Sequence, residues 1–178
     1  MRHLLKRTGV FFLLLVSIVA LSGCGTQEAA SSAQKIKAVP AFSTKDLKGN
    51  TVTQEIFAKK KLTVVNVWGT FCPPCIGEMP ELGAWAREMP EDVQIIGLIC
   101  DVEGAQDREH LELARKITSE ARADFVNIYP DEALYRFLSD VEAVPTTFFV
   151  DSNGQVVGEP IIGANVAGYR AFVESRLK

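Results

Sequence analysis

The feature that most constrains this chain is an apolar run that leads into a pair of cysteines. Leu62–Trp68 is rich in β-branched and apolar residues, which is typical of a buried strand in a parallel sheet. Cys72 and Cys75 follow, and the two prolines between them suit the first turn of a helix, where a missing N–H does no harm. The pattern therefore predicts a strand, a tight turn and a helix to about Met89, with two sulfur atoms one helical turn apart at its start.

Strand-like and helix-like segments alternate along the rest of the chain. The remaining predicted elements are a hairpin over 41–52, a strand over 93–100, a helix after Gly104, a short edge strand over 125–129, a helix capped by Asp131 that ends near Leu138, a hairpin turned at 151–154 and a closing helix capped by Asn165. This order predicts an α/β fold, in which a central mixed sheet carries helices on both faces.

The first 23 residues have the features of an export signal. Arg2, Lys6 and Arg7 precede an apolar run over residues 10–21. The run is too short to span a bilayer, which needs about 20 apolar residues. A basic start followed by a short apolar stretch is typical of a signal peptide, so we assign residues 1–23 to one.

The apolar run ends in the sequence LSGC, which resembles the lipobox of bacterial lipoproteins. The resemblance implies cleavage before Cys24 and lipidation of its thiol, which would anchor the chain to a membrane. Ordinary signal cleavage and an uncleaved anchor are the alternatives. Residues 24–37 are small and polar, which predicts a flexible tether, and residues 38–178 are predicted to form the folded domain.

Charge and cysteine usage narrow the function. The chain has 19 Lys and Arg against 22 Asp and Glu, and Lys59–Lys61 is its only positive run, so nucleic acid is not an expected partner. With Cys24 assigned to lipid and two cysteines in the C-x-x-C pair, Cys100 is left over. In an exported chain, few cysteines with an odd remainder favour redox chemistry over a disulfide-stapled scaffold.

The position of the pair at a helix start predicts its chemistry. Free N–H groups and the positive end of the helix dipole favour a thiolate at Cys72, with a pKa below the ordinary value of about 8.5. Cys75, one turn further in, is expected to be less exposed and to resolve a mixed disulfide formed at Cys72. A zinc half-site is an alternative, although Cys100 and His110 would complete it poorly, and a passive structural disulfide is another.

The sequence around the pair, with a distant Val-Pro-Thr, resembles the thioredoxin-like superfamily and, within it, the membrane-anchored TlpA/ResA branch of thiol-disulfide oxidoreductases. The matching residues are Trp68, Cys72, Cys75, Glu78, Pro80, Val144, Pro145 and Thr146. The resemblance implies a cis peptide bond before Pro145, which leaves the backbone of Val144 free to hydrogen-bond a substrate strand. It also implies a substrate-binding surface of Trp68, Phe71, Pro73, Pro74, Val144 and Thr146.

The sequence departs from the family pattern beside the first cysteine, where Phe71 stands in place of the usual Trp. The TlpA/ResA branch often has an acid just past the next strand, and Asp101 and Glu103 are the candidates here. A carboxylate whose pKa is raised by burial would deprotonate Cys75 during resolution. A solvated loop acid is the alternative interpretation for either residue.

The segment between the strand that ends at Cys100 and Pro145 is interpreted, on the resemblance, as a helix-containing insertion that shapes partner choice. Cys100 itself has two interpretations. It is either a buried core thiol or, because it ends a strand at the same sheet edge as Cys72, a third redox thiol.

These observations predict an extracytoplasmic, lipid-anchored thiol-disulfide oxidoreductase that acts as a monomer on protein cysteines and needs no cofactor beyond its own disulfide. The resemblance implies the reductive direction, a membrane electron donor of the CcdA/DsbD type and apocytochrome c as a client. A disulfide oxidase is the close alternative. A thiol peroxidase would need Thr where Gly69 stands, and a Sco-type copper-binding protein would need one more residue between the cysteines.

Overall fold

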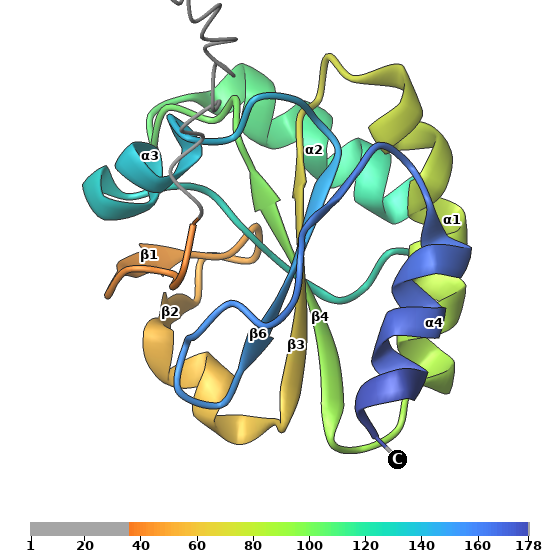
Figure 1. Cartoon of the computed structure of the whole chain (residues 1–178). Coiled ribbons are helices and arrows are strands. Elements are labelled where there is room, and N and C mark those ends of the chain that lie inside the picture. Colours follow the sequence, from red (N-terminus) through yellow and green to blue (C-terminus); the bar gives the residue numbers. More distant parts are fainter. Residues whose placement is uncertain (1–35, 178) are drawn as a thin grey trace, which may run out of the picture. The chain divides into compact units, whose positions relative to one another are not determined.

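A five-stranded mixed sheet lies at the centre of the fold. The computed structural model describes residues 36–177, and the strand order of this sheet is β5-β4-β3-β6-β7 (Figure 1). The strands are β3 (Leu62–Trp68), β4 (Val93–Ile99), β5 (Val126–Ile128), β6 (Thr146–Asp151) and β7 (Ile161–Ile162). β3, β4 and β5 are parallel, whereas β6 is antiparallel to β3 and to β7. The predicted α/β fold is confirmed, and β3 has its predicted bounds.

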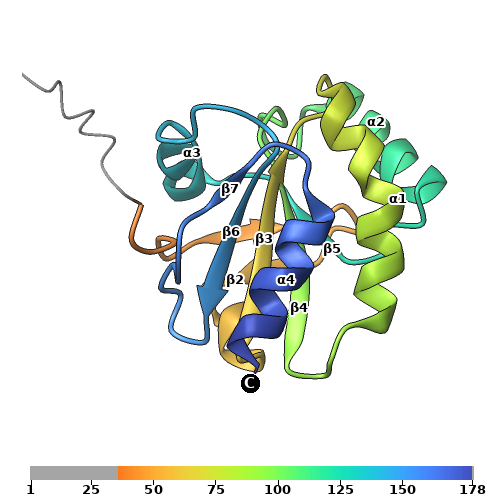
Figure 2. The same cartoon turned by 45° about the vertical axis from the view of Figure 1, so that its right-hand side comes forward.

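Alternate side chains of β3 face two separate cores. Val64 and Trp68 pack with three helices, and Val65 and Val67 pack against the opposite set of elements. The first set is α1 (Pro73–Glu88), α2 (Arg108–Glu120) and α4 (Val166–Arg176); the second is η1 (Gln54–Lys59), α3 (Glu132–Leu138) and the N-terminal hairpin. In both views α1 and α4 lie side by side on one face of the sheet (Figures 1 and 2). Helices therefore cover both faces, as predicted.

The N-terminal hairpin consists of two three-residue antiparallel strands, β1 (Ser43–Lys45) and β2 (Thr51–Thr53). Its turn contacts the edge of the sheet, because Leu47 N donates to Asn127 O at 3.0 Å. An edge strand leaves backbone groups unpaired, and this contact satisfies one of them. Together with α2, β5 and α3, which follow β4 in the chain, the hairpin matches the additions expected from the sequence.

Side-chain caps fix where three of the helices begin. Asp131 accepts a hydrogen bond from Leu134 N and Asn165 accepts one from Gly168 N, so both predicted caps are confirmed. The structure adds a third, since Asp107 caps α2 by accepting from His110 N. These caps satisfy backbone donors that the first turn of a helix leaves free.

The second predicted hairpin forms, with Gly154 at a φ of 78° in its turn. Its arms pair around the bridge between Val150 and Val156, since Asp151 N donates to Gln155 O at 2.9 Å and Val157 N donates to Phe149 O at 2.8 Å. On the outer side of the return arm, Val156 N donates to Lys37 O at 2.9 Å and so pairs with the incoming chain. The next strand to pair with β6 is β7, further along the chain.

The predicted signal peptide, the tether up to residue 35 and the lipidation of Cys24 lie outside the described residues. Within residues 36–177, none of the helices has the length and apolar character needed to cross a bilayer.

Candidate active site

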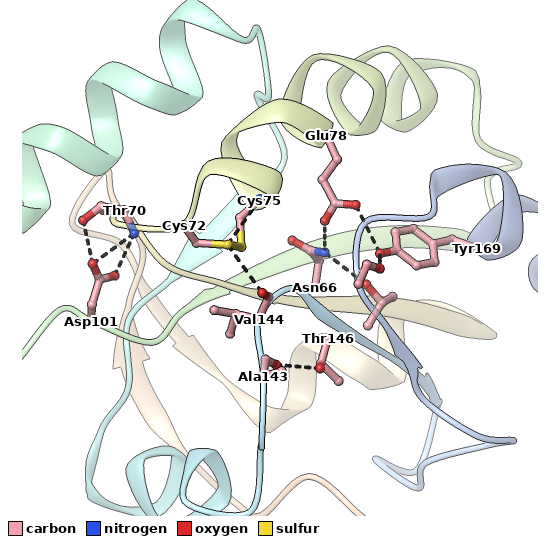
Figure 3. Close-up of a disulfide and its surroundings, with 12 residues drawn as sticks. Asn66, Thr70, Cys72, Cys75, Glu78, Asp101, Ala143, Val144, Thr146 and Tyr169 are labelled. Atoms are coloured by element: carbon pink, nitrogen blue, oxygen red, sulfur yellow. Dashed lines mark hydrogen bonds between the residues drawn. A yellow bond between two sulfur atoms is a disulfide. The ribbon is translucent and has the colours of Figure 1, made fainter.

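The cysteine pair lies at the junction of β3 and α1, where the two sulfur atoms form a disulfide with an S–S distance of 2.05 Å (Figure 3). Cys72 is the N-cap of α1, and its Sγ accepts a hydrogen bond from Cys75 N at 3.3 Å. Cys72 exposes 4% of its surface and Cys75 none, so Cys75 is the less exposed sulfur, as expected, by a small margin. In the reduced protein, a thiolate at Cys72 would be stabilised by the N–H of Cys75 and by the positive end of the α1 dipole.

The loop before β6 packs against the disulfide. The Val144–Pro145 peptide bond is cis, which confirms the prediction, and Val144 O lies 3.5 Å from Cys72 Sγ. Two hydrogen bonds hold the loop, because Thr146 Oγ1 donates to Ala143 O at 2.7 Å and Gly163 N donates to Pro145 O at 2.8 Å. Two distant segments of the chain therefore meet at the nucleophilic sulfur.

A buried carboxyl group lies one turn beyond Cys75 on the same helix. Glu78 exposes 6% of its surface; its Oε1 accepts from Asn66 Nδ2 at 2.8 Å, and its Oε2 is 3.1 Å from the Tyr169 hydroxyl (Figure 3). Burial raises the pKa of the Glu78 carboxyl, and the hydrogen bonds from Asn66 and Tyr169 offset that shift only in part. Glu78 therefore holds its proton more tightly than an exposed glutamate does.

The hydrogen bonds of Tyr169 fit a protonated Glu78. The Tyr169 hydroxyl lies 2.8 Å from Gly163 O and 3.1 Å from Glu78 Oε2, yet it has a single proton to donate. Burial raises the pKa of Tyr169 to about 12, so the phenol keeps that proton near neutral pH. When the hydroxyl donates to Gly163, only a protonated Glu78 supplies the hydrogen for the second contact.

Asn66 has an unpaired oxygen beneath the disulfide. Its Nδ2 donates to Glu78 and to Thr147 Oγ1, at 2.8 and 3.0 Å, which uses both amide protons. Among residues 36–177, Asn66 Oδ1 is the buried side-chain polar atom that has no hydrogen-bond partner. Figure 3 shows this oxygen on the side of the amide that points toward the Cys72–Cys75 disulfide. A buried acceptor without a donor is unfavourable, so a donor that appears on reduction would be stabilised there.

Comparisons with known proteins agree with this geometry. The Redoxin family matches residues 34–165, which is most of the chain. The chain belongs to the Redoxin family.

Relatives of this redoxin include disulfide-exchange enzymes. The thiol:disulfide interchange protein DsbE of Haemophilus influenzae is 31% identical over 72% of this chain and 67% of its own length. The thiol-disulfide oxidoreductase ResA of Bacillus thuringiensis is 27% identical over 69% of this chain and 67% of its own length. The resemblance inferred from the motifs is confirmed, and the chain is a thiol-disulfide oxidoreductase of the ResA/DsbE type.

The fold of this chain is also similar to the folds of solved structures. The crystal structure of a thiol:disulfide interchange protein DsbE from Chlorobium tepidum superimposes with a TM-score of 0.63, covering 80% of this chain and 95% of that one at 20% identity. At that identity the similarity supports the thioredoxin-like fold and nothing finer.

The structure does not place a buried acid just after β4. The Glu103 side chain is exposed, and the half-buried Asp101 accepts hydrogen bonds from Thr70 N and Thr70 Oγ1. Asp101 thus holds the loop that leads to Cys72 in place, and neither of the two side chains is buried. The buried acid near the disulfide is Glu78, which the sequence pattern presented as a motif residue without a role.

Two of the six predicted substrate-binding residues are also corrected. Trp68 has no exposed surface and its Nε1 donates to Asn127 Oδ1 at 3.0 Å, so it belongs to the core. Thr146 exposes 4% of its surface and braces the loop through Ala143. The alternation of strand side chains turns both residues inward. Of the other four, Phe71, Pro73 and Pro74 are exposed and Val144 is half-buried.

Cys100 is a free, half-buried thiol in the described part of the chain. Burial, with a smaller contribution from the charge of Asp101, raises the pKa of Cys100 to about 11. Because the thiolate is the reactive form, this environment argues against the third redox thiol and for the packing role.

We therefore expect reduced protein treated briefly with iodoacetamide at pH 7 to be alkylated at Cys72 and to leave Cys100 unmodified. Peptide mass spectrometry measures the two extents separately, and the same reaction in denaturant, where Cys100 loses its environment, is the control. Modification of Cys100 as fast as Cys72 in the folded protein would contradict the assignment.

Proposed function

We propose that this redoxin is an extracytoplasmic, membrane-anchored reductant of disulfides in exported proteins, and that it acts as a monomer through Cys72 and Cys75 without a further cofactor. The observation that supports it most directly is the disulfide at the start of α1, with Val144 O 3.5 Å from Cys72 Sγ. One sulfur is thereby presented at an open backbone edge along which a substrate chain can lie.

The proposed reaction transfers two electrons in two exchange steps. The Cys72 thiolate attacks one sulfur of a substrate disulfide, a Cys72–substrate bond forms, and the other substrate sulfur leaves as a thiolate that takes up a proton. Cys75 then loses its proton and attacks Cys72 Sγ, and the substrate sulfur leaves as the second thiolate. The substrate ends as a dithiol and the protein as the disulfide seen here.

The buried polar groups serve the second step in this proposal. In the reduced protein, Asn66 Oδ1 accepts the S–H of Cys75, which supplies the missing donor, and Asn66 Nδ2 holds Glu78. Glu78 takes the proton that Cys75 loses, because a carboxyl pKa raised toward the working pH suits a general base. The protonated Glu78 that fits the contacts of Tyr169 is the expected product of that transfer.

The two prolines favour the reductive direction. Pro73 and Pro74 fill the first two positions of α1 and have no N–H, so Cys75 N is the donor left in this turn that reaches Cys72 Sγ. Strong disulfide oxidants owe their potential to a stabilised reduced form. Because Pro73 and Pro74 donate no hydrogen bond to the Cys72 thiolate, the reduced form of this protein is stabilised less. A less stable dithiol gives up its electrons more readily and is therefore a better reductant.

The location and partners rest on the sequence. A signal peptide over residues 1–23 and a lipidated Cys24 would hold the domain at the outer face of a membrane, where a reductant needs electrons delivered through the membrane. A donor of the CcdA/DsbD type would supply them by dithiol exchange, and apocytochrome c is the proposed client.

A redox titration of the purified chain tests the direction. We expect a potential well below about −200 mV, whereas a potential near about −120 mV, typical of strong oxidants, would establish the oxidase alternative. Pro74→Ala, which adds an N–H beside Cys72, is expected to raise the potential. Rapid peroxide turnover would instead support a thiol peroxidase, and tight stoichiometric Cu(I) binding a Sco-type protein.

A further inference from the structure

A line of hydrogen bonds joins the buried acid to the loop before β6. Tyr169 has no exposed surface, and its hydroxyl lies 3.1 Å from Glu78 Oε2 (Figure 3) and 2.8 Å from Gly163 O. Gly163 N donates to Pro145 O at 2.8 Å, next to the Val144 carbonyl that contacts the disulfide. The carboxyl group that serves the second exchange step is therefore linked to the loop that faces the nucleophilic sulfur.

Gly163 makes both of the connecting contacts. It directly follows β7 with a φ of 89°, in the left-handed region that favours glycine. In this conformation its carbonyl oxygen meets the phenol from α4, while its N–H meets the loop before β6. A change in the hydrogen bond at the carbonyl therefore affects the residue that holds Pro145.

The contacts of the Tyr169 hydroxyl are complete in one protonation state of Glu78. A phenol has one proton and two lone pairs, and Asn165 N occupies one lone pair at 3.2 Å. When Glu78 is protonated, it donates to the second lone pair, and the phenol proton goes to Gly163 O. When Glu78 is ionised, two acceptors compete for one proton. A hydrogen bond to a charged oxygen is the stronger one, so the phenol turns to Glu78 and Gly163 O loses its donor.

We propose that Tyr169 is a positioning residue that couples the protonation of Glu78 to the loop before β6. While Glu78 is ionised, the Tyr169 hydroxyl donates to it and the loop is held less firmly. When Glu78 takes the proton of Cys75, the hydroxyl donates to Gly163 O and the loop is held firmly again. This inference rests on the proposed function, to which it adds a link between resolution of the mixed disulfide and the loop along which the substrate lies.

One proton is transferred in this step. The S–H bond of Cys75 breaks and an O–H bond forms on Glu78. Because Glu78 Oε1 accepts from Asn66 Nδ2, the transferred proton is placed on Oε2, where it meets Tyr169. The phenol O–H bond turns and does not break, since burial raises the pKa of Tyr169 to about 12.

The groups that face Glu78 determine the sign of the expected effect. Burial raises the pKa of its carboxyl group, the hydrogen bonds from Asn66 on β3 and Tyr169 on α4 lower it, and the charge of Glu81 on α1 raises it. β6 contributes the neutral Thr147, which accepts from Asn66. Removal of the phenol hydroxyl removes a hydrogen bond that favours the carboxylate, so the pKa of Glu78 should rise further.

Tyr169→Phe tests the first half of the proposal, because Phe fills nearly the same space and lacks the hydroxyl. Reduced full-length protein is mixed with a symmetric peptide disulfide, and decay of the Cys72–peptide adduct is followed by acid-quenched intact-mass spectrometry at a series of pH values. Resolution by wild-type protein should become faster as Glu78 ionises. In the variant we expect the midpoint of this pH profile to rise by about one pH unit, so that resolution is about tenfold slower below the midpoint and nearly unchanged on the plateau. A role in packing alone would change the rate at every pH and leave the midpoint in place.

The amide of Gly163 tests the second half, because its N–H is the donor to Pro145 O. Hydrogen exchange is measured by NMR on the oxidised protein and corrected for the intrinsic effect of pH. Protection of this amide in wild-type protein should fall severalfold as the pH rises and Glu78 ionises. In Tyr169→Phe the protection should be low whether or not Glu78 is ionised.

Tyr129→Phe is the matched control, because Tyr129 is also buried, at 7% exposed, and follows β5 at the opposite edge of the sheet from β7. It should keep the wild-type midpoint. In the Glu78→Gln background, adding Tyr169→Phe should leave the pH profile unchanged.

Three results would overturn the role of Tyr169 and leave the reductase activity standing. They are a midpoint that Tyr169→Phe does not move, a shift that persists in the Glu78→Gln background, and protection of the Gly163 amide in wild-type protein that stays constant with pH. Failure of reduced wild-type protein to form any adduct with the peptide disulfide, or to reduce it, would overturn the proposed function itself.

Discussion

Cys72→Ser is expected to lower the rate of disulfide reduction by at least about a thousandfold, because it removes the sulfur that attacks the substrate. Cys75→Ser should behave differently. The first exchange needs only Cys72, which still accepts the N–H of residue 75 at the helix start. Without a resolving sulfur the mixed disulfide persists, so this variant should accumulate a covalent protein–substrate adduct instead of losing reactivity.

Intact-mass spectrometry after mixing each reduced variant with a disulfide substrate distinguishes the two outcomes. Cys24→Ser is the matched control, since the predicted role of Cys24 is lipidation and not redox chemistry, and it should turn over normally in solution. If Cys75→Ser formed no adduct while Cys72→Ser did, the order of the two sulfurs would be reversed. Adducts on both variants would mean that a second thiol, Cys75 or Cys100, also attacks the substrate; for Cys100 this would contradict its raised pKa.

Local patterns in the sequence predicted the parts of the site that lie within single segments. The apolar run gave β3 its predicted bounds, and the prolines placed Cys72 at the first turn of α1. The Val-Pro-Thr motif predicted the cis bond before Pro145 only through the family resemblance, because a proline at a strand start is equally compatible with a trans bond.

Features that depend on distant contacts could not be predicted in this way. Glu78 lies in a helix with other acids, and nothing local distinguishes it from an exposed residue. Its burial depends on Asn66 from β3 and on Tyr169 from α4, which is 91 positions away in the chain. The signal available in the sequence was its place three residues after Cys75, which puts both on one helix face.

Strand geometry accounts for the two substrate-surface assignments that the structure corrects. The family resemblance placed Trp68 and Thr146 on that surface, but their strand positions turn both side chains into the core.

Replacing Glu78 with Gln is expected to separate stability from activity. Gln has nearly the shape of Glu, so its carbonyl oxygen can accept from Asn66 and its amide can donate to Tyr169, as a protonated Glu78 does. It has no titrating proton, so we expect release of the mixed disulfide to slow by roughly a hundredfold or more and to lose its pH dependence. Adduct formation at Cys72 should be nearly unchanged, because the first exchange does not use Glu78.

The difference in stability between this variant and the wild type should depend on pH, in a direction set by the raised pKa of Glu78. Folding raises the pKa of Glu78 above its ordinary value of 4.5, so its ionisation disfavours the folded state, and wild-type protein loses stability as pH rises from 4.5 through the raised pKa. The Gln variant escapes that loss, by about 1.4 kcal/mol for each pH unit between the two pKa values. Urea unfolding at several pH values measures the difference, with the exposed Glu112→Gln as control. If Glu78→Gln resolved its adducts as fast as wild type, the buried carboxyl would be structural and the Cys75 proton would leave by another route.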